Sequence, residues 1–598
     1  MSVGPLAGGG PFVLAVEPDP VRAFLHLPRS ARRNGVAVLL CPPFGWEEVC
    51  SYRARRNWAD DLAEAGFPAA RIELPATGDS GGDPGDADRV EAWTTAVGHA
   101  AEWLRESTGA ERLCALGIGL GGLLACRAVA SGAPIDDLAL WAVRSRGKAL
   151  LREMRAYAGV VADRVPQEAR PEALAPGELD LAGFLMSAET VRGVESTDVA
   201  SLEAPRSADR RVLLLERDGL PVDRALREHF DRAGAEVSVR PTGDYTPMML
   251  EPQDSLTPRG TIATTIAWLE AGSPAQAASA PRSAPPGHTV MELVWDGTPI
   301  RERPIRLDTE HGEIFGVVAE PVDGPSGSIC AVWLGAGALR HIGPSRMWVE
   351  ISRRWAARGV PSVRVDLPGI GESEGDAGEP MTNANMYSAD RVEQAHAVLD
   401  QLAAQGLPDR FVLGGLCAGA YWALRVALAD ERVISAMMIN LYAFTWSEAL
   451  AAERETSSAL RGLRSALWRR VIRLRMDREL MKRSAQRLRP DRIRASVRRP
   501  AERAQAQEGR RAFALFAERG TEALFLLSRG EALHGQLTRL GLLKDADRWP
   551  SVHIDALPTR DHVFRAVWLQ RLVHASVDRA LERTLERARV EHRDSLVR

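Results

Sequence analysis

The chain has 598 residues, of which 45% are hydrophobic and 26% are charged, so it is a folded protein long enough for at least two domains. Its 76 Lys and Arg residues against 79 Asp and Glu residues exclude a chain that as a whole binds nucleic acid or an acidic membrane surface. Its six cysteines are too sparse for a disulfide scaffold, and because none forms a CxxC pair a structural zinc site is not indicated.

The N-terminus reads MSVGPLAGGG and lacks the basic and apolar regions of a secretion signal. No run of 18 apolar residues follows anywhere, so we expect no membrane-spanning helix. The sequence therefore predicts a cytoplasmic protein with reduced cysteines that binds neither a metal nor a cofactor.

The chain contains its own sequence twice. Residues 74–83 read LPATGDSGGD and residues 367–376 read LPGIGESEGD, each after a helical stretch and a strand-like run. Further along, LCALGIGLGG at 113–122 matches FVLGGLCAGA at 411–420, and each leads from an apolar run into a glycine-rich turn and a helical pattern. Two homologous halves explain these matches better than coincidence does.

A change in composition separates the two copies. Residues 272–288, GSPAQAASAPRSAPPGH, consist almost wholly of small residues and proline, which is typical of a linker. We therefore predict a first half over 1–272, a linker over 273–288 and a second half over 289–598.

Both halves alternate short β-branched runs with longer amphipathic stretches, which indicates an α/β fold with a mostly parallel sheet flanked by helices. An arginine-rich helical segment at about 445–520 interrupts the second half, and a shorter segment near 145–205 interrupts the first. In open α/β sheets such insertions lie over the carboxyl ends of the strands, where ligands bind. We therefore predict a helical cap on each half.

The second half contains a candidate nucleophile. Residues 415–419, GLCAG, fit the G-x-S-x-G turn with Cys417 in place of serine. A strand-to-helix turn that exposes its central side chain leaves no room for a Cβ atom two residues to either side, so glycines flank it. The helix N-terminus also favours a thiolate. The alternative is a buried structural cysteine beside a capping glycine.

Two residues further along the chain complete a candidate triad. Glu531 follows the apolar run ALFLL, and His562 follows the strand-like run VHID and precedes a helical pattern. Nucleophile, acid and histidine then occur in the chain order that this kind of turn uses. We predict that Cys417, Glu531 and His562 act together, and that His534 and His553 are ordinary surface or structural residues.

These features resemble the α/β-hydrolase superfamily over nearly the whole chain outside the linker. CPPFGWEE at 41–48 and LGAGALRHIGPSRMWVEISRRWAARG at 334–359 are similar to segments of hydrolases associated with exosortase systems and natural-product clusters. The resemblance implies a helical cap and an oxyanion hole formed by the amide of Ala418 with that of Ala336 or Gly337. Cysteine in place of the usual serine departs from the superfamily's commonest pattern.

The first half has the same pattern without the reactive groups. Its turn, GIGLG, has Gly119 at the place of the nucleophile, and Tyr245 aligns with the histidine. Asp218 remains as the counterpart of the acid. We therefore predict that this half is a degenerate hydrolase domain without catalytic activity, which serves in structural support, cap positioning or partner binding.

The cap of the second half is strongly basic. Residues 461–500 contain 15 Lys and Arg residues against three acidic ones, and Trp468 is the only aromatic residue among them. Without further aromatic side chains this segment does not fit single-stranded nucleic acid, and a solvated helix is the simple alternative. We expect Arg469, Arg470 and Arg473 to contact an anionic donor, either an acidic acyl carrier protein or coenzyme A.

The sequence thus predicts an acyltransferase that works through an acyl-cysteine intermediate. It would move an acyl group from a thioester donor to a small-molecule alcohol or amine, and the resemblance to natural-product clusters places the reaction in secondary metabolism. Hydrolysis of an ester or thioester by the same residues is one alternative, and a non-catalytic scaffold is another.

Overall fold

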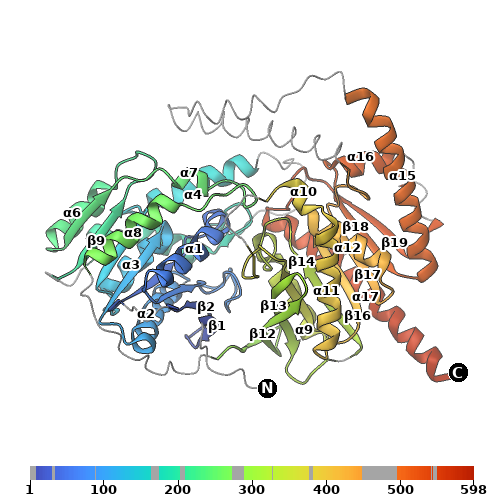
Figure 1. Cartoon of the computed structure of the whole chain (residues 1–598), viewed down its shortest axis with the longest axis horizontal. Coiled ribbons are helices and arrows are strands. Elements are labelled where there is room, and N and C mark those ends of the chain that lie inside the picture. The colour runs from blue at the N-terminus through green and yellow to red at the C-terminus, as the bar shows by residue number, and fades with distance from the viewer. Residues whose placement is uncertain are drawn as a thin grey trace.

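The computed structural model describes residues 9–29, 34–87, 89–162, 174–202, 209–272, 288–325, 327–375, 381–447, 494–539, 542 and 548–597. The predicted linker, apart from His288, lies outside these residues, and so does 448–493 in the predicted cap. Figure 1 shows two bodies side by side, one coloured from blue to green and the other from light green to red.

The first body is built on a sheet of eight described strands. In spatial order they are β1 (Gly9–Leu14), β2 (Val21–His26), β4 (Ala69–Ile72), β3 (Val36–Cys41), β5 (Arg112–Ile118), β6 (Asp137–Trp141), β9 (Arg211–Leu215) and β10 (Glu236–Arg240). β2 pairs antiparallel with β1 and with β4, and the remaining neighbours are parallel. The central strand β3 reads VAVLLC and is buried along its whole length, as expected where helices cover both faces.

The second body repeats this order in a sheet of nine described strands. They are β11 (Met291–Trp295), β12 (Thr298–Thr309), β13 (Gly312–Pro321), β15 (Ser362–Asp366), β14 (Ile329–Leu334), β16 (Arg410–Leu416), β17 (Val433–Ile439), β18 (Glu522–Ser528) and β19 (Val552–Leu557). Apart from the added edge strand β11, each strand has a counterpart at the same place in the first sheet. The duplication seen in the sequence therefore extends to the strand order.

Helices cover both faces of the first sheet. One buried apolar cluster joins the sheet to α2 and α3, and another joins it to α1 and α8. The helices of this body are α1 (Trp46–Glu64), α2 (Arg89–Thr108), α3 (Leu120–Ala130), α4 (Gly147–Ala162), α5 (Ala188–Ser196), α6 (Arg224–Arg232), α7 (Tyr245–Met248) and α8 (Arg259–Ala271). Between β6 and β9, α4 and α5 flank a small hairpin of β7 (Leu179–Asp180) and β8 (Leu185–Met186), at the place predicted for the first cap.

The second sheet is covered in the same way, with α11, α12 and α15 packed on one face and α9 and α17 on the other. The helices described here are α9 (Met347–Ala357), α10 (Asn383–Met386), α11 (Ala389–Ala404), α12 (Ala418–Ala429), α15 (Arg494–Arg519), α16 (Ala532–Arg539) and α17 (Val567–Val597). The predicted fold class, two α/β units with mostly parallel sheets flanked by helices, is confirmed. Among the residues placed in the structure, none of the helices has the length and apolarity needed to cross a membrane.

The two bodies contact each other through the repeated segments. Arg71 and Arg364 occupy corresponding positions in the two copies, and so do Asp79 and Glu372. Arg364 forms an ion pair with Asp79 of the first half at 3.0 Å, and Arg71 forms one with Glu372 of the second half at 2.8 Å. The contact is thus approximately symmetric, as between two copies of one domain.

Glu302 on β12 supports this contact from within the second half. Its two carboxylate oxygens accept hydrogen bonds from Arg353 at 2.7 Å and from Arg364 at 2.8 Å, and the side chain is fully buried. Burial alone would raise the pKa of Glu302, but the charges of Arg353 and Arg364 outweigh it and lower the pKa to about 2. Glu302 is therefore an anion that neutralises two buried arginines.

We expect Glu302→Ala to reduce the free energy of unfolding by about 3–5 kcal/mol, because it leaves Arg353 and Arg364 without this partner. The exposed Glu228, paired with Arg224 one turn away on α6, is the control, and Glu228→Ala should change stability by less than about 0.5 kcal/mol. Urea denaturation at pH 7 measures both. Because the pKa of Glu302 is lowered on folding, its contribution should be complete above about pH 4.5 and should fall as the pH drops towards 2. Equal effects of the two substitutions would contradict this account.

Candidate active site

Cys417 lies at the sharp turn between β16 and α12, where it is the N-cap residue of the helix with φ 60° and ψ −110°. Such a positive φ is strained for a residue with a side chain, and it persists because the surroundings enforce it. A Cβ atom at Gly415 would overlap the backbone of Gly419, and one at Gly419 would overlap the carbonyl oxygen of Gly335. The two glycines of the GLCAG pattern are therefore required by the tightness of the turn.

His562 and Glu531 come together at the same edge of the sheet. Glu531 follows β18 and His562 lies in the loop after β19, and their side chains meet with His562 Nδ1 2.7 Å from Glu531 Oε1. The other ring nitrogen, Nε2, is buried, and the Cys417 side chain acts on the ring both by a hydrogen bond and by charge. The other two histidines considered lie apart from this group: His534 is on α16, and His553 on β19 contacts Glu522 at 3.1 Å.

The charge state of His562 follows from its neighbours. Burial alone would lower the pKa of His562, but the charges of Cys417 and Glu531 outweigh burial and raise the pKa to about 10. Because the anion of Cys417 contributes to this shift, an imidazolium at His562 and a thiolate at Cys417 stabilise each other. This geometry supports a thiolate–imidazolium pair in the resting site.

Two polar residues that the sequence reasoning missed hold the histidine loop. Asn440 follows β17 with a positive φ of 46°, and its Nδ2 donates to the carbonyl oxygen of His562 at 2.7 Å and to Ser528 Oγ at 2.9 Å. Ser528 Oγ in turn donates to the carbonyl oxygen of Asp561 at 3.0 Å. A signal was present, since an asparagine directly after the apolar strand VISAMMI falls at the edge where sites are built. Ala142 has the corresponding place after β6, so the first half lacks this clamp.

Tyr387 also escaped the sequence reasoning. Its hydroxyl oxygen is 3.4 Å from Cys417 Sγ, and its ring stacks on Trp446 at 3.9 Å between ring centroids. The backbone just before Tyr387 is held by α12, because Trp422 Nε1 donates to the carbonyl oxygen of Met386 at 2.7 Å. Nothing in the sequence around Tyr387 points to this role, because only the tertiary fold brings the residue beside the thiol.

The predicted oxyanion-hole residues lie on two adjoining segments. Ala418 is the first residue of α12, and Ala336 and Gly337 lie in the loop that follows β14. The backbone of this loop approaches α12 so closely at Gly335 that Gly419 cannot carry a side chain. The assignment of these amides to an oxyanion hole stays a prediction. The predicted donor-binding arginines, Arg469, Arg470 and Arg473, lie outside the described residues.

The corresponding site of the first half is filled by a carboxylate. Gly119 is the N-cap of α3 with φ 51° and ψ −117°, close to the conformation of Cys417, and a Cβ atom there would overlap the carboxyl group of Glu47. The hydroxyl of Tyr245 donates to Glu47 Oε1, and burial raises the pKa of Glu47 to about 7. Asp218 accepts the backbone N–H of Tyr245 at 3.1 Å. The histidine and the nucleophile are thus replaced by a tyrosine–carboxyl pair, and the carboxyl group lies against the turn at Gly119.

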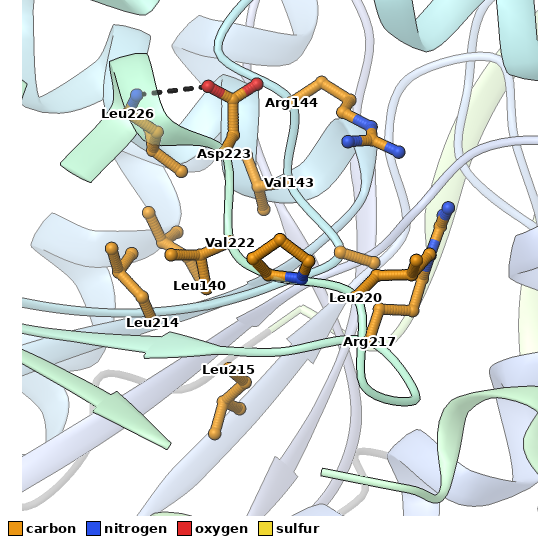
Figure 2. Close-up of a pocket in the computed structure, with 12 residues that line it drawn as sticks. Leu140, Val143, Arg144, Leu214, Leu215, Arg217, Leu220, Val222, Asp223 and Leu226 are labelled. Atoms are coloured by element: carbon orange, nitrogen blue, oxygen red, sulfur yellow. Dashed lines mark hydrogen bonds between the residues drawn. The ribbon is translucent and has the colours of Figure 1, made fainter. Parts of the chain in front are cut away.

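A pocket in the first half lies at the carboxyl ends of β6 and β9, lined by Leu140, Ala142, Val143, Arg144, Leu214, Leu215, Arg217, Leu220, Pro221, Val222, Asp223 and Leu226 (Figure 2). Its two arginines, Arg144 and Arg217, both form ion pairs with Glu153. Asp223 caps α6 by accepting the N–H groups of Ala225 at 3.0 Å and Leu226 at 3.3 Å. The polar groups of this pocket therefore already have partners within the protein.

Within the ranges described, no three His, Cys, Asp or Glu side chains are grouped so that they could hold a metal ion. None of the six cysteines forms a disulfide, and all six are buried.

Comparison with known proteins shows that the second half is similar to a known family. Residues 332–596, which contain Cys417, Glu531 and His562, match the model of the alpha/beta hydrolase family. Solved structures similar to the chain include Est1E from Butyrivibrio proteoclasticus, with 14% identity over 44% of this chain and 98% of that one and a TM-score of 0.30. A lidless serine hydrolase from Xanthomonas campestris matches with 15% identity over 46% of this chain and 96% of that one, with a TM-score of 0.27. No curated protein matched the chain.

The charge state of the site predicts how Cys417 responds to pH. In the wild type, a protonated His562 stabilises the thiolate, so alkylation of Cys417 by iodoacetamide should stay fast as the pH falls from 8 to about 6. In His562→Gln the pH midpoint should rise towards the value of about 8.5 for an ordinary cysteine. Peptide mass spectrometry separates Cys417 from the other five cysteines. Identical pH midpoints in the two proteins would show that no such ion pair exists.

Proposed function

We propose that the chain is an acyltransferase that carries the acyl group on Cys417. The observation that carries the proposal is the position of this cysteine, on a strained turn at a helix N-terminus and beside a His562–Glu531 pair that is charged at neutral pH. A thiolate attacks thioesters readily, and the acyl-enzyme it forms is itself a thioester that an alcohol or amine can accept. The resemblance of residues 334–359 to hydrolases of natural-product clusters supports a role in secondary metabolism.

The reaction proceeds in two halves. The Cys417 thiolate attacks the carbonyl carbon of the donor thioester, and the amide of Ala418 with that of Ala336 or Gly337 stabilises the oxyanion. The carbon–sulfur bond to the donor breaks, and the departing thiolate takes the proton of the His562 imidazolium and leaves as a thiol. The now neutral His562 then takes a proton from the acceptor hydroxyl or amine as this attacks the acyl-enzyme. The product ester or amide leaves, and the thiolate–imidazolium pair is restored.

Hydrolysis of an ester or thioester is the second candidate, favoured by the match of residues 332–596 to the alpha/beta hydrolase family. Two features support transfer instead. Cys417 is only 7% exposed, and one side of its thiol is covered by the hydroxyl of Tyr387, whose ring stacks on Trp446. A scaffold without catalysis is the third possibility, and it gives no reason for a complete set of nucleophile, base and acid.

Two substitutions of Cys417 test the proposal. Wild-type protein incubated with a panel of acyl thioesters should gain the mass of one acyl group on the Cys417 peptide, and Cys417→Ala should gain none. With an acceptor present, Cys417→Ser should slow transfer at least tenfold or shift the product towards free acid, because an oxygen ester passes its acyl group on less readily than a thioester.

Three outcomes decide among the candidates. Free acid as the main product of both wild type and Cys417→Ser would mean hydrolysis. Full turnover by Cys417→Ala would overturn covalent catalysis. Acylation of any residue in the first half would contradict the interpretation of Gly119, Glu47 and Tyr245 as an inactive site.

The donor is proposed to be anionic and to approach residues 461–500, the basic segment, which contains 15 Lys and Arg residues against three acidic ones. The triple substitution Arg469→Glu, Arg470→Glu and Arg473→Glu should raise KM for a carrier-protein or coenzyme A donor about tenfold, with a smaller effect at high salt. It should leave KM for an uncharged thioester analogue within about twofold.

The control reverses three exposed arginines elsewhere, in the triple substitution Arg224→Glu, Arg227→Glu and Arg232→Glu on α6 of the first half. It changes the net charge by the same amount and should leave KM for both donors unchanged. Equal effects of the two triple substitutions, or equal effects on charged and uncharged donors, would show that the basic segment does not recognise the donor.

A further inference from the structure

The loop after β14 leaves its own domain and inserts into the first half. This loop, residues 335–346, begins beside the turn of Cys417 and contains the predicted oxyanion residues. Five residues after Gly335, the side chain of Arg340 is buried among residues of the first half. It forms an ion pair with Glu73, lies 3.4 Å from Glu48 Oε1, and sits over the ring of Tyr52 at 4.0 Å from its centroid.

The next residue of the loop bridges the two halves. His341 Nε2 is 2.6 Å from Asp79 Oδ2 of the first half, and Nδ1 is 2.7 Å from Asp366 Oδ2 of the second half. Each of these three residues has 1% or less of its surface exposed. Burial alone would lower the pKa of His341, but the charges of Asp366 and Asp79 raise it to about 10, so the ring is a cation that donates to both carboxylates.

The end of the loop is held by the backbone of the first half. Arg346 Nε donates to the carbonyl oxygen of Gly78 at 2.8 Å, and its Nη2 donates to that of Ser80 at 2.8 Å. Ser345 and Arg346 both have positive φ values, of 48° and 71°, which L-residues adopt only where the surroundings enforce them. Residues 340–346 of the loop are therefore held by groups of the first half together with Asp366 of the second half.

We propose that the first half is a positioning partner for the active site of the second half, in which Asp79 and Glu73 hold residues 335–346 in the conformation that directs the oxyanion amides at Cys417. This inference rests on the proposed function, because the oxyanion role of Ala336 or Gly337 belongs to it. It assigns a task to a domain whose own site is filled by Glu47.

The first half also contacts the chain that follows His562, through residues other than Asp79 and Glu73. The guanidinium of Arg565 lies over the ring of Trp46 at 4.8 Å from its centroid. Two residues further along the chain, the backbone N–H of Val567 donates to Asp180 Oδ2 of the first half at 2.8 Å. These contacts do not involve Asp79 or Glu73. A substitution at Asp79 should therefore disturb residues 335–346, the oxyanion loop, and leave the Cys417–His562 pair in place.

The pseudo-symmetry of the halves provides a matched control. Asp79 and Glu372 occupy the same position in the repeated motif, both are buried or nearly so, and each accepts an arginine from the other half. Only Asp79 also binds the oxyanion loop, through His341. Asp79→Asn and Glu372→Gln are therefore equivalent changes to the contact between the halves that differ in their effect on this loop.

Three measurements on the full-length proteins test the proposal. Single-turnover acylation of Cys417 by an activated thioester needs the oxyanion hole, whereas alkylation by iodoacetamide needs the thiolate alone. We expect Asp79→Asn to slow acylation at least tenfold while alkylation stays within twofold of the wild type. Glu372→Gln should leave both rates within twofold. Thermal unfolding of both variants sets an assay temperature well below each Tm, so that both are compared in the folded state and general instability is removed as an explanation.

Hydrogen–deuterium exchange supplies a readout that needs no catalysis. Amides of 335–346 should exchange at least tenfold faster in Asp79→Asn and at the wild-type rate in Glu372→Gln. Unchanged exchange of this loop in Asp79→Asn, or equal losses of acylation in both variants, would overturn the proposal. A wild-type protein that forms no acyl-enzyme would instead refute the proposed function, and the exchange of the loop would still decide whether Asp79 holds it.

Discussion

The structure depends on a buried group of charges between its two halves. Asp79 accepts from Arg364 at 3.0 Å and from His341 at 2.6 Å, and none of the three is exposed to solvent. Removing such charges from water costs several kcal/mol for each ion, so the arrangement is stable only when every partner is in place. It tolerates little sliding or rotation of one half on the other, because an unpaired buried charge would result. Apolar surfaces would stabilise contact as well, but they would not determine its geometry so narrowly.

The contact is formed by the same motif in both halves, although their turns at Gly119 and Cys417 differ. The motif after β4 and its copy after β15 have the same internal bonds: the backbone N–H of Asp79 donates to Glu73, and that of Glu372 donates to Asp366. The reactive residues diverged, whereas the motif that joins the halves did not. In the first half the carboxyl group of Glu47 lies against the turn at Gly119, where the second half has Cys417.

The chemistry of the site follows from where its groups lie along the two sheets. Parallel strands bring their carboxyl ends to one edge, so the turn after β16, the loops after β18 and β19, and Asn440 after β17 all meet there. Within that cluster, burial alone would lower the pKa of His562, whereas the charges of Cys417 and Glu531 raise it. The second effect prevails at His562, and its raised pKa favours an imidazolium beside the thiol.

The sequence by itself determined the features that depend on short stretches of chain. The repeat, the alternation of strands and helices, and the GLCAG turn are local patterns, because a tight strand-to-helix turn imposes its glycines within two residues of Cys417. The chain order of Glu531 and His562 added the rest of the candidate triad. Tertiary structure alone decided what lies across space. Tyr387 beside the thiol, Glu47 over Gly119, and His341 against Asp79, 262 residues away, carry no local signal. Their identities follow from the packing of one domain on another, and a single sequence contains no pattern that relates residues so far apart.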